Sequence, residues 1–214
     1  MSECLSMASL IPSTETLLRR SAKPAEAEPT PESLRKMHTM LRNSGYHSAN
    51  RQVYSAIVEH GARMLDGTDY KGLFLKGPVG VGKSFGVEIL AQHFRIPVLR
   101  PDLIAAQYKE FNGNLRMLEE RLILTAGDFW HEPQNIIIDE LGTNDNARHY
   151  GESSALMCDV LDMRYRAFLR YGVKTIVTTN LDDSELARRY GVRIDDRLNE
   201  MFYFRSVSGV SLRK

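Results

Sequence analysis

One eight-residue segment restricts the fold of this chain more than any other: Gly77-Pro78-Val79-Gly80-Val81-Gly82-Lys83-Ser84. It has the spacing G-x-x-x-x-G-K-[ST], in which glycines let backbone N–H groups approach phosphate oxygens that a side chain would block. Apolar residues typical of a buried strand precede it at 73–75, and the spacing of a largely buried helix follows at 84–94. A plain glycine turn before a helix is the alternative. A strand, a glycine loop and a helix in this order favour a nucleoside triphosphate site.

The residue types in this loop have distinct expected roles. Lys83 is expected to reach the β- and γ-phosphates, and the Ser84 hydroxyl to join the shell of a magnesium ion. The predicted ligands are therefore ATP and Mg²⁺. Phe85 directly follows the loop and also counts toward the apolar face of the helix. The predicted nucleotide-binding residues are Gly77, Pro78, Val79, Gly80, Val81, Gly82, Lys83, Ser84 and Phe85.

Composition narrows the classes of function. The 214 residues carry a formal net charge of +1, so no overall field favours nucleic acid or a membrane surface, and any such contact is local. The two cysteines, Cys4 and Cys158, match no metal or redox spacing and indicate reduced thiols. The sequence has no apolar run of membrane-spanning length and no secretory signal. We therefore expect a cytoplasmic protein without membrane contact.

The first part of the chain differs in composition from the rest. Residues 21–33 are rich in Pro, Glu and Ala, which favours a linker because such a segment buries little apolar surface. Short helices are expected at 14–20, forming on a partner, and at 33–41. We therefore expect a flexible N-terminal tail with a partner-binding segment over residues 1–45, and one globular domain over 46–214.

Apolar runs and helical spacings alternate through the globular part. Strands are expected at 72–76, 96–99, 135–140, 174–179 and 201–207. The expected helices are 49–65, 84–94, 102–111, 115–126, 153–171 and 183–190. Continuous apolar strands that alternate with helices indicate a parallel sheet covered on both faces, a three-layer α/β fold.

A second polar site follows the third expected strand. The run Ile136-Ile137-Ile138 ends in Asp139 and Glu140, which places both carboxylates at the carboxyl edge of the sheet, where α/β folds bind ligands. Asp139 is expected to hold Mg²⁺, directly or through water, and Glu140 to orient an attacking water. The alternative is a strand that happens to end in two acids. An acid beside the metal ligand suits hydrolysis better than transfer to another acceptor.

Two further polar residues complete the candidate catalytic set. Asn180 follows the strand at 174–179, and its amide can hydrogen-bond the attacking water or the γ-phosphate, or cap the next helix. An arginine of segment 191–198 can neutralise charge at the γ-phosphate of a neighbouring subunit, or form a surface ion pair. Arg197 is the first choice for this role and Arg193 the second. The predicted catalytic residues are Lys83, Glu140, Asn180 and Arg197.

In their order along the chain, these elements resemble the DnaC/IstB-type AAA+ ATPases. The likeness covers about residues 48–214 and includes the wording of 72–78 and 178–181 besides the motifs above. Members of this family are bacterial and phage helicase loaders and the ATPase helpers of insertion-sequence transposition. The resemblance implies the following roles: Walker A at Lys83 and Ser84, Walker B at Asp139 and Glu140, sensor 1 at Asn180 and an arginine finger at Arg197. It also implies the strand order 5-1-4-3-2 and ATP-dependent assembly of a homo-oligomeric ring or spiral around single-stranded DNA.

Two features differ from the family pattern. Loaders usually carry a sizeable N-terminal helicase-binding domain, whereas only about 45 residues precede the core here. Most AAA+ proteins also have a C-terminal helical lid with a second sensor arginine. We expect no lid in this chain, and Arg213 is the candidate for a basic residue near the nucleotide. The sequence leaves open whether the partner is a replicative helicase or a transposase.

A direct DNA contact needs local positive charge. The candidate groups are Lys109, Arg116 and Arg121, and Arg164, Arg166 and Arg170. Acidic residues are interleaved with both groups, which favours a salt-bridged surface.

Three functions remain after the sequence has been analysed. The first is an ATP-hydrolysing AAA+ helper that loads or remodels a DNA-processing machine. The second is a P-loop kinase acting on a small molecule or nucleotide, and the third is an ATP-dependent docking switch that hydrolyses negligibly. The Asp139–Glu140 pair, Asn180 and segment 191–197 favour the first over the second.

Overall fold

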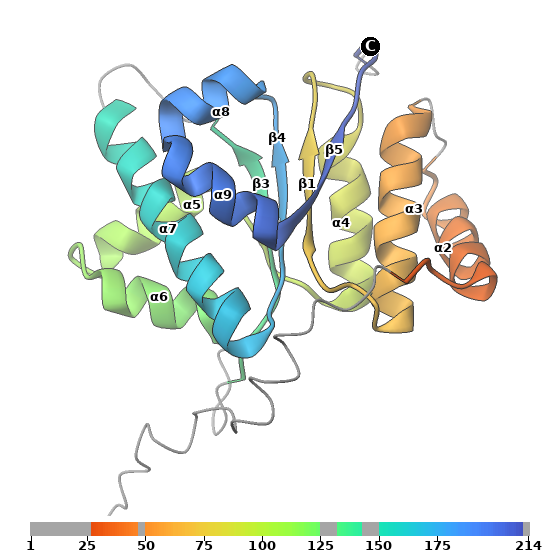
Figure 1. Cartoon of the computed structure of the whole chain (residues 1–214), viewed down its shortest axis with the longest axis horizontal. Helices are drawn as coiled ribbons and strands as arrows, with labels where there is room; N and C mark the ends of the chain where they lie inside the picture. The colour runs from red at the N-terminus through yellow and green to blue at the C-terminus, as the bar shows by residue number, and fades with distance from the viewer. Residues whose placement is uncertain (1–26, 47–49, 125–131, 143–149, 212–214) are drawn as a thin grey trace, which may run out of the picture.

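The computed structural model describes residues 27–46, 50–124, 132–142 and 150–211 (Figure 1). Within these ranges, none of the helices combines the length and the apolar character needed to cross a bilayer. The helix expected at 14–20, Cys4 and Arg213 lie outside the described residues.

A five-stranded sheet forms the centre of the molecule. Its strands are β1 (Gly72–Lys76), β2 (Val98–Leu99), β3 (Ile136–Leu141), β4 (Thr175–Thr179) and β5 (Phe202–Ser206). They pair in the order β2-β3-β4-β1-β5, and every pairing is parallel. Read from the other edge, this is the predicted order 5-1-4-3-2, which the structure confirms. The carboxyl ends of β1, β3 and β4 therefore meet at one edge of the sheet.

Helices cover both faces of the sheet and make the outer layers (Figure 1). On one face lie α3 (Arg51–Asp66) and α4 (Lys83–Phe94), with α2 (Pro31–Asn43) packed outside α3. On the other face lie α5 (Pro101–Glu110), α6 (Leu115–Ile123), α7 (Tyr150–Tyr171), α8 (Asp183–Tyr190) and α9 (Val192–Met201). The predicted three-layer α/β class is confirmed.

Alternate residues of each strand enter different cores. In β1, Leu73 and Leu75 pack with the helices of the α3–α4 face, whereas Phe74 packs with α5 to α9. All three side chains are buried. Because successive side chains of a strand point to opposite faces, a strand covered on both sides needs apolar residues throughout. This explains why the strands could be recognised as continuous apolar runs.

The N-terminal boundary of the packed unit differs from the prediction. The short helix expected at 33–41 is present as α2, but it packs on α3 with Met37 and Leu41 fully buried. Thr30 caps it, because its side-chain oxygen accepts a hydrogen bond from the Ser33 N–H at 3.2 Å. The packed unit thus begins near residue 31 and not at 46, since residues assigned to the tail contribute to the core.

The segment between α8 and β5 also differs from the sequence interpretation. Residues 192–201 form α9, where no helix was predicted. Leu198 and Met201 bury the inner side of this helix against the core shared with α7 and α8. The segment that contains Arg193 and Arg197 is therefore a packed helix, and apolar contacts fix its backbone.

Residues 207–211 follow β5 and run beside the glycine loop. The Val207 N–H donates to the Lys76 carbonyl at 2.8 Å, and the Asn50 amide donates to the Ser208 carbonyl at 2.7 Å. A Cβ atom on Gly80 would lie only 2.2 Å from the Ser211 hydroxyl oxygen. The glycine loop is thus supported from outside by the segment after the last strand.

Candidate functional site

A pocket of about 600 Å³ lies between the glycine loop and the ends of β3 and β4. Its floor is made by loop residues, including Gly80, Gly82 and Lys83. The strand ends contribute Asp139, Glu140 and Asn180. The glycine loop and the ends of β3 and β4 therefore meet in one pocket, as predicted from the parallel sheet.

The glycine loop leads directly into the first turn of α4. Gly82 is the N-cap of this helix with φ 96°, and it provides no side-chain cap for the first N–H groups. Gly80 has φ 83°, and the neighbouring Ser211 leaves no room for a Cβ atom there. Uncapped N–H groups at a helix N-terminus form a ready site for an anion. The local geometry thus suits a phosphate.

Lys83 is held inside the loop. Its ammonium donates to the carbonyls of Gly77 and Pro78 at 2.7 and 2.8 Å, and to the Asn180 Oδ1 atom at 2.7 Å. The residue is only 5% exposed. Burial lowers the pKa of Lys83 to about 8, while the nearby carboxylates of Asp139 and Glu140 oppose that shift. The hydrogen-bond partners of the ammonium are neutral oxygens, so a triphosphate placed here would supply a negatively charged partner.

The contact with Lys83 also fixes the orientation of the Asn180 amide. An ammonium group only donates hydrogen bonds, so the amide oxygen faces Lys83 and the NH₂ group faces elsewhere. Since Asn180 lines the pocket, this NH₂ group is a donor for a ligand oxygen. Asn180 therefore lies in the same pocket as the glycine loop, in contact with Lys83.

Asp139 and Glu140 sit on an irregularity of β3. The register between β3 and β4 shifts between Ile138 and Leu141, and Glu140 has φ 61°. Thr178 of β4 bridges the two acids: its hydroxyl donates to Asp139 Oδ1 and accepts from the Glu140 N–H at 2.9 Å. A bulge of this kind redirects side chains at the end of a strand. It brings both carboxylates to the pocket wall instead of to opposite faces of the sheet.

The residues predicted to hold Mg²⁺ have suitable donors. Ser84 supplies a hydroxyl and Asp139 a carboxylate, and both line the pocket. Mg²⁺ prefers oxygen ligands and in nucleotide sites takes only one or two from the protein, the rest coming from phosphates and water. In the described part of the chain, no group of three or more His, Cys, Asp or Glu residues gathers at a metal-binding distance. Ser84 and Asp139 therefore fit the ion only together with a nucleotide.

Arg197 lies outside this pocket. Its guanidinium pairs with Asp162 of α7 and stands over the ring of Tyr165, 5.4 Å from the centroid. The side chain of Arg193 lies outside the described residues. The structure thus brings together Lys83, Asp139, Glu140 and Asn180, and leaves Arg197 on another surface.

The sequence interpretation missed two contributions to the site. Thr178 is fully buried and links both acids, and Tyr46 walls the pocket although it was assigned to the boundary of the tail. Thr178 could have been found, because it stands two residues before Asn180 and alternate strand residues point the same way. Tyr46 gave no such signal.

Phe85 lies in the pocket, but its burial differs from the expectation. It lines the pocket, in agreement with its place among the predicted nucleotide-binding residues. However, it is 49% exposed and does not belong to the buried face of α4. Packing in the core therefore does not explain why an apolar residue stands at position 85.

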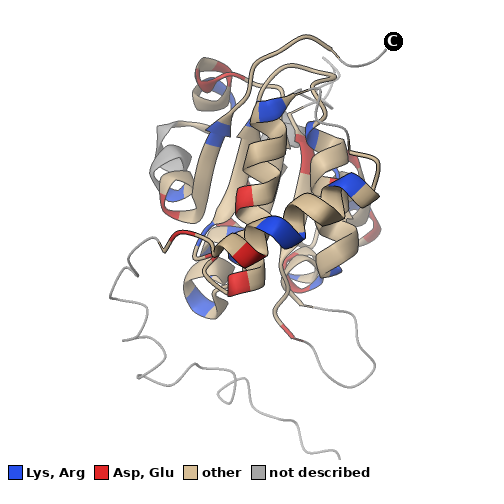
Figure 2. Ribbon diagram, turned by 90° about the vertical axis from the view of Figure 1, so that its right-hand side faces the viewer, with Lys and Arg blue, Asp and Glu red and all other residues tan. Residues whose placement is uncertain are grey.

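Three of the six candidate DNA-binding residues are engaged in contacts within the fold: Arg116, Arg164 and Arg166. Arg164 is fully buried and donates to four oxygens, those of Thr175 Oγ1 and the carbonyls of Leu122, Gln134 and Lys174. Arg166 pairs with acids at 119 and 162, and Arg116 with Glu120. Figure 2 shows the other side of the molecule, where α2 and α3 likewise carry both basic and acidic residues. The ion pairs of Arg116 and Arg166 favour the salt-bridged alternative for these two residues.

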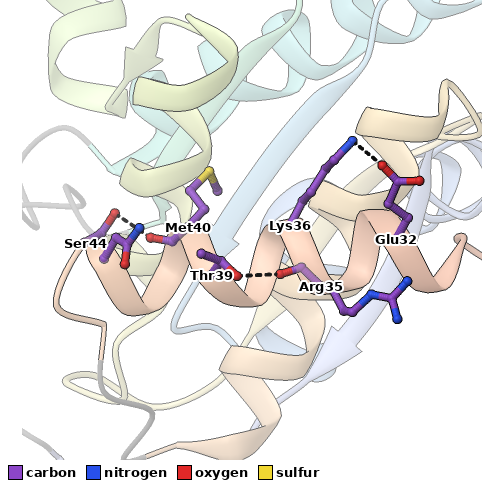
Figure 3. A pocket seen from close by; sticks show the side chains of 7 residues that line it. Glu32, Arg35, Lys36, Thr39, Met40 and Ser44 are labelled. Atoms are coloured by element: carbon purple, nitrogen blue, oxygen red, sulfur yellow. Dashed lines mark hydrogen bonds and ion pairs between the residues drawn. The ribbon is translucent and has the colours of Figure 1, made fainter.

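A second hollow, of about 580 Å³, lies along the outside of α2 (Figure 3). Its lining residues come from this helix and its C-cap Ser44, and Lys36 pairs with Glu32 at 2.8 Å along it. It has neither a glycine loop nor a strand end. None of the predicted site residues lines this hollow, whereas several of them line the pocket at the glycine loop.

Comparison with known proteins supports the fold. No protein-family model matches the sequence, and neither does any curated protein. Among solved structures, the DnaC helicase loader is similar with a TM-score of 0.53 and 20% identity over 76% of this chain and 94% of that chain. A protein described as a primosome component of Streptococcus pyogenes serotype M3 is similar with a TM-score of 0.52 and 18% identity, over 86% and 92%.

The replication initiator DnaA, bound to AMPPCP and single-stranded DNA, is similar with a TM-score of 0.53 and 14% identity. The likeness covers 85% of this chain and about half, 51%, of that one. At the level of fold, these similarities confirm the predicted resemblance to DnaC-like AAA+ ATPases.

Proposed function

We propose that this protein is an AAA+ ATPase that binds ATP with Mg²⁺ and hydrolyses it to ADP and phosphate while loading or remodelling a DNA-processing machine. One observation carries the proposal: a single pocket gathers the glycine loop with Lys83, the Asp139–Glu140 bulge and Asn180. Each group has the chemistry that triphosphate hydrolysis needs at the position where it stands.

The residues of the pocket have separate tasks in this proposal. The N–H groups of the loop and the Lys83 ammonium bind the phosphate oxygens, and Ser84 and Asp139 hold Mg²⁺. When bound, Mg²⁺ neutralises charge on the β- and γ-phosphates. Glu140 orients the attacking water and accepts its proton, and the Asn180 NH₂ group donates to the γ-phosphate or to that water. Thr178 keeps both carboxylates in place.

Arg197 is proposed to act on a neighbouring copy of the chain. It lies outside its own pocket, and its pairing with Asp162 holds the guanidinium at the surface of α9. Such an arginine completes a catalytic site only in an oligomer, which supports nucleotide-dependent assembly.

The proposed partner is a replicative helicase or a transposase, with single-stranded DNA as a further ligand. The similarity to a helicase loader and to a primosome component favours the replicative partner. This role places the protein in the cytoplasm.

Calorimetry and phosphate-release assays test the proposal, with and without single-stranded DNA. We expect MgATP binding that Lys83→Ala weakens strongly, and turnover that Glu140→Gln abolishes while ATP stays bound. Lys36→Ala, which removes an exposed lysine of α2 outside the pocket, serves as the matched control and should change neither.

Each contrary outcome has a defined meaning. The absence of binding with ATP and Mg²⁺ would overturn the proposal. Tight binding without turnover under either condition would make the protein a docking switch. Phosphate transfer to an added small acceptor would make it a kinase.

A further inference from the structure

Two aromatic residues wall the candidate nucleotide pocket. Phe85 stands on the first turn of α4, and Tyr46 follows the end of α2. Their rings stack with centroids 5.3 Å apart and an angle of 28° between the planes. Tyr46 is buried, whereas Phe85 is 49% exposed. An exposed phenyl ring in the wall of a pocket is apolar surface that a bound ligand can remove from water.

Phe85 is the outer member of a row of four rings. Tyr46 stacks on Tyr54 of α3 with centroids 5.9 Å apart and planes within 6°. Tyr54 in turn hydrogen-bonds His38 of α2, with 2.9 Å between its hydroxyl oxygen and the His38 Nδ1 atom. The Tyr46 N–H donates to the Leu41 carbonyl at 3.0 Å, which fixes its backbone. The ring behind Phe85 is therefore held by two helices.

The position of Phe85 relates it to the non-phosphate end of a nucleotide. It directly follows Ser84 and lies two residues after Lys83, so a nucleotide whose phosphates occupy the loop has its nucleoside within reach of the phenyl ring. The pocket volume of about 600 Å³ lies within the range of small-molecule sites. Bases stack on aromatic side chains because every base has a π-face. The base of a nucleotide is thus a suitable stacking partner for the Phe85 ring.

We propose that Phe85 is the stacking platform for the base of the bound nucleotide, and that Tyr46 positions it. This inference rests on the proposed nucleotide site and adds to it the feature that recognises the base. It also assigns a role to α2 and α3, since these helices hold the supporting rings. The platform selects a nucleotide over a bare polyphosphate, and stacking by itself discriminates weakly between different bases.

The experiment compares a ligand with a base and one without it. Calorimetry measures the dissociation constants of MgATP and magnesium tripolyphosphate for the wild type and Phe85→Ala. We expect Phe85→Ala to weaken MgATP binding about 5- to 150-fold, the range for loss of one base–aromatic stack. Tripolyphosphate binding should change less than about twofold, since the substitution keeps the backbone N–H of residue 85 and the phenyl ring has no group that binds phosphate. Leu103→Ala, which removes a 47% exposed side chain of α5, is the matched control and should change neither constant.

Two further variants test the geometry. Phe85→Trp keeps a stacking surface, so its MgATP affinity should stay near that of the wild type. The fluorescence of the new indole, corrected for the wild-type signal, should change with MgATP and not with saturating tripolyphosphate. Tyr46→Leu removes the supporting ring and should weaken MgATP binding less than Phe85→Ala, again without an effect on tripolyphosphate.

The outcomes separate this inference from the proposed function. If Phe85→Ala leaves MgATP binding unchanged, or weakens both ligands equally, the platform is refuted while the nucleotide site stands. If the wild type binds neither ligand, the proposed function fails as well. An indole signal that responds equally to both ligands would assign Phe85 to the phosphate loop and also refute the platform.

Discussion

Thr178→Val removes a side chain that hydrogen-bonds both acids of the candidate catalytic site. The Thr178 hydroxyl donates to Asp139 Oδ1 and accepts from the Glu140 N–H at 2.9 Å. Valine has nearly the same shape, so the substitution deletes these two hydrogen bonds and leaves the packing of β4 in place. We expect the bulge at Asp139–Glu140 to relax and the two carboxylates to lose their alignment.

The size of the effect follows from the bonds that are lost. A hydrogen bond to a charged group contributes about 1.5–3 kcal/mol, and an unpaired buried donor costs about 1–3 kcal/mol. Glu140 has φ 61°, a conformation that costs a non-glycine residue about 1–2 kcal/mol. The free energy of the lost hydrogen bonds is thus as large as the cost of the Glu140 conformation. Without these bonds the backbone can relax. A net loss of about 1.5–3 kcal/mol in transition-state stabilisation corresponds to a turnover about 10- to 100-fold lower.

Steady-state phosphate release at saturating MgATP measures this loss, and calorimetry measures the affinity for ATP. The affinity should stay within a few-fold of the wild type, because Thr178 touches neither the loop nor Lys83. Thr178→Ser keeps the hydroxyl and should restore most of the turnover. Thr179→Val is the matched control, since the Thr179 hydroxyl bonds the Leu141 carbonyl and neither acid. Wild-type turnover in Thr178→Val, or an equal loss in Thr179→Val, would refute this reasoning.

The other predictions concern Arg197 and His60. Arg197→Ala should abolish turnover with ATP affinity nearly intact, and mixing it with Lys83→Ala should restore part of the turnover, because mixed oligomers join an intact site to an intact finger; equal loss of affinity and turnover would make Arg197 a structural residue. Burial lowers the pKa of His60 to about 3, so between pH 6.5 and 3 the unfolded chain binds a proton that the folded chain does not. Stability should be complete above about pH 6.5 and fall with decreasing pH, by up to about 2 kcal/mol at pH 5. Three basic side chains reinforce this shift: Arg63, Lys174 and Arg205. Urea unfolding should show a smaller loss at pH 5 in His60→Leu, and an unchanged loss would contradict the assignment.

The sheet and the glycine loop were predictable because their signals are local. Each strand is a short apolar run, and alternation with helices restricts the connections to a parallel sheet. The loop at 77–84 requires glycine at fixed positions, so its spacing is visible without any knowledge of tertiary contacts. The convergence of Asp139 and Asn180 on that loop then follows from the common edge of the sheet.

The helix expected at 33–41 is present, but its start at Pro31 and its packing on α3 were not predicted. Pro31 lies directly after the cap residue Thr30, and proline is favoured at the first position of a helix. The buried residues Ser33, Met37 and Leu41 recur at every fourth position, which is helical spacing. The Pro-rich composition of residues 21–33 indicated a linker and obscured this helical pattern at its end. The exposure of Phe85 could not be predicted from the sequence either. An apolar residue on a helix gives the same sequence pattern whether it lines a pocket or enters the core.

The conformation of Glu140 shows most clearly what only the tertiary structure provides. Three described residues other than glycine have positive φ: Arg95, Asn112 and Glu140. Arg95 and Asn112 follow the ends of α4 and α5, where a left-handed residue commonly terminates a helix. Glu140 lies inside a strand, so helix termination does not explain it. Its backbone is held by a hydroxyl from the neighbouring strand, 38 residues later in the chain, and no local pattern announces that bond. Strain maintained in this way at the wall of a pocket indicates a position fixed for function, and it singles out Glu140 independently of any motif.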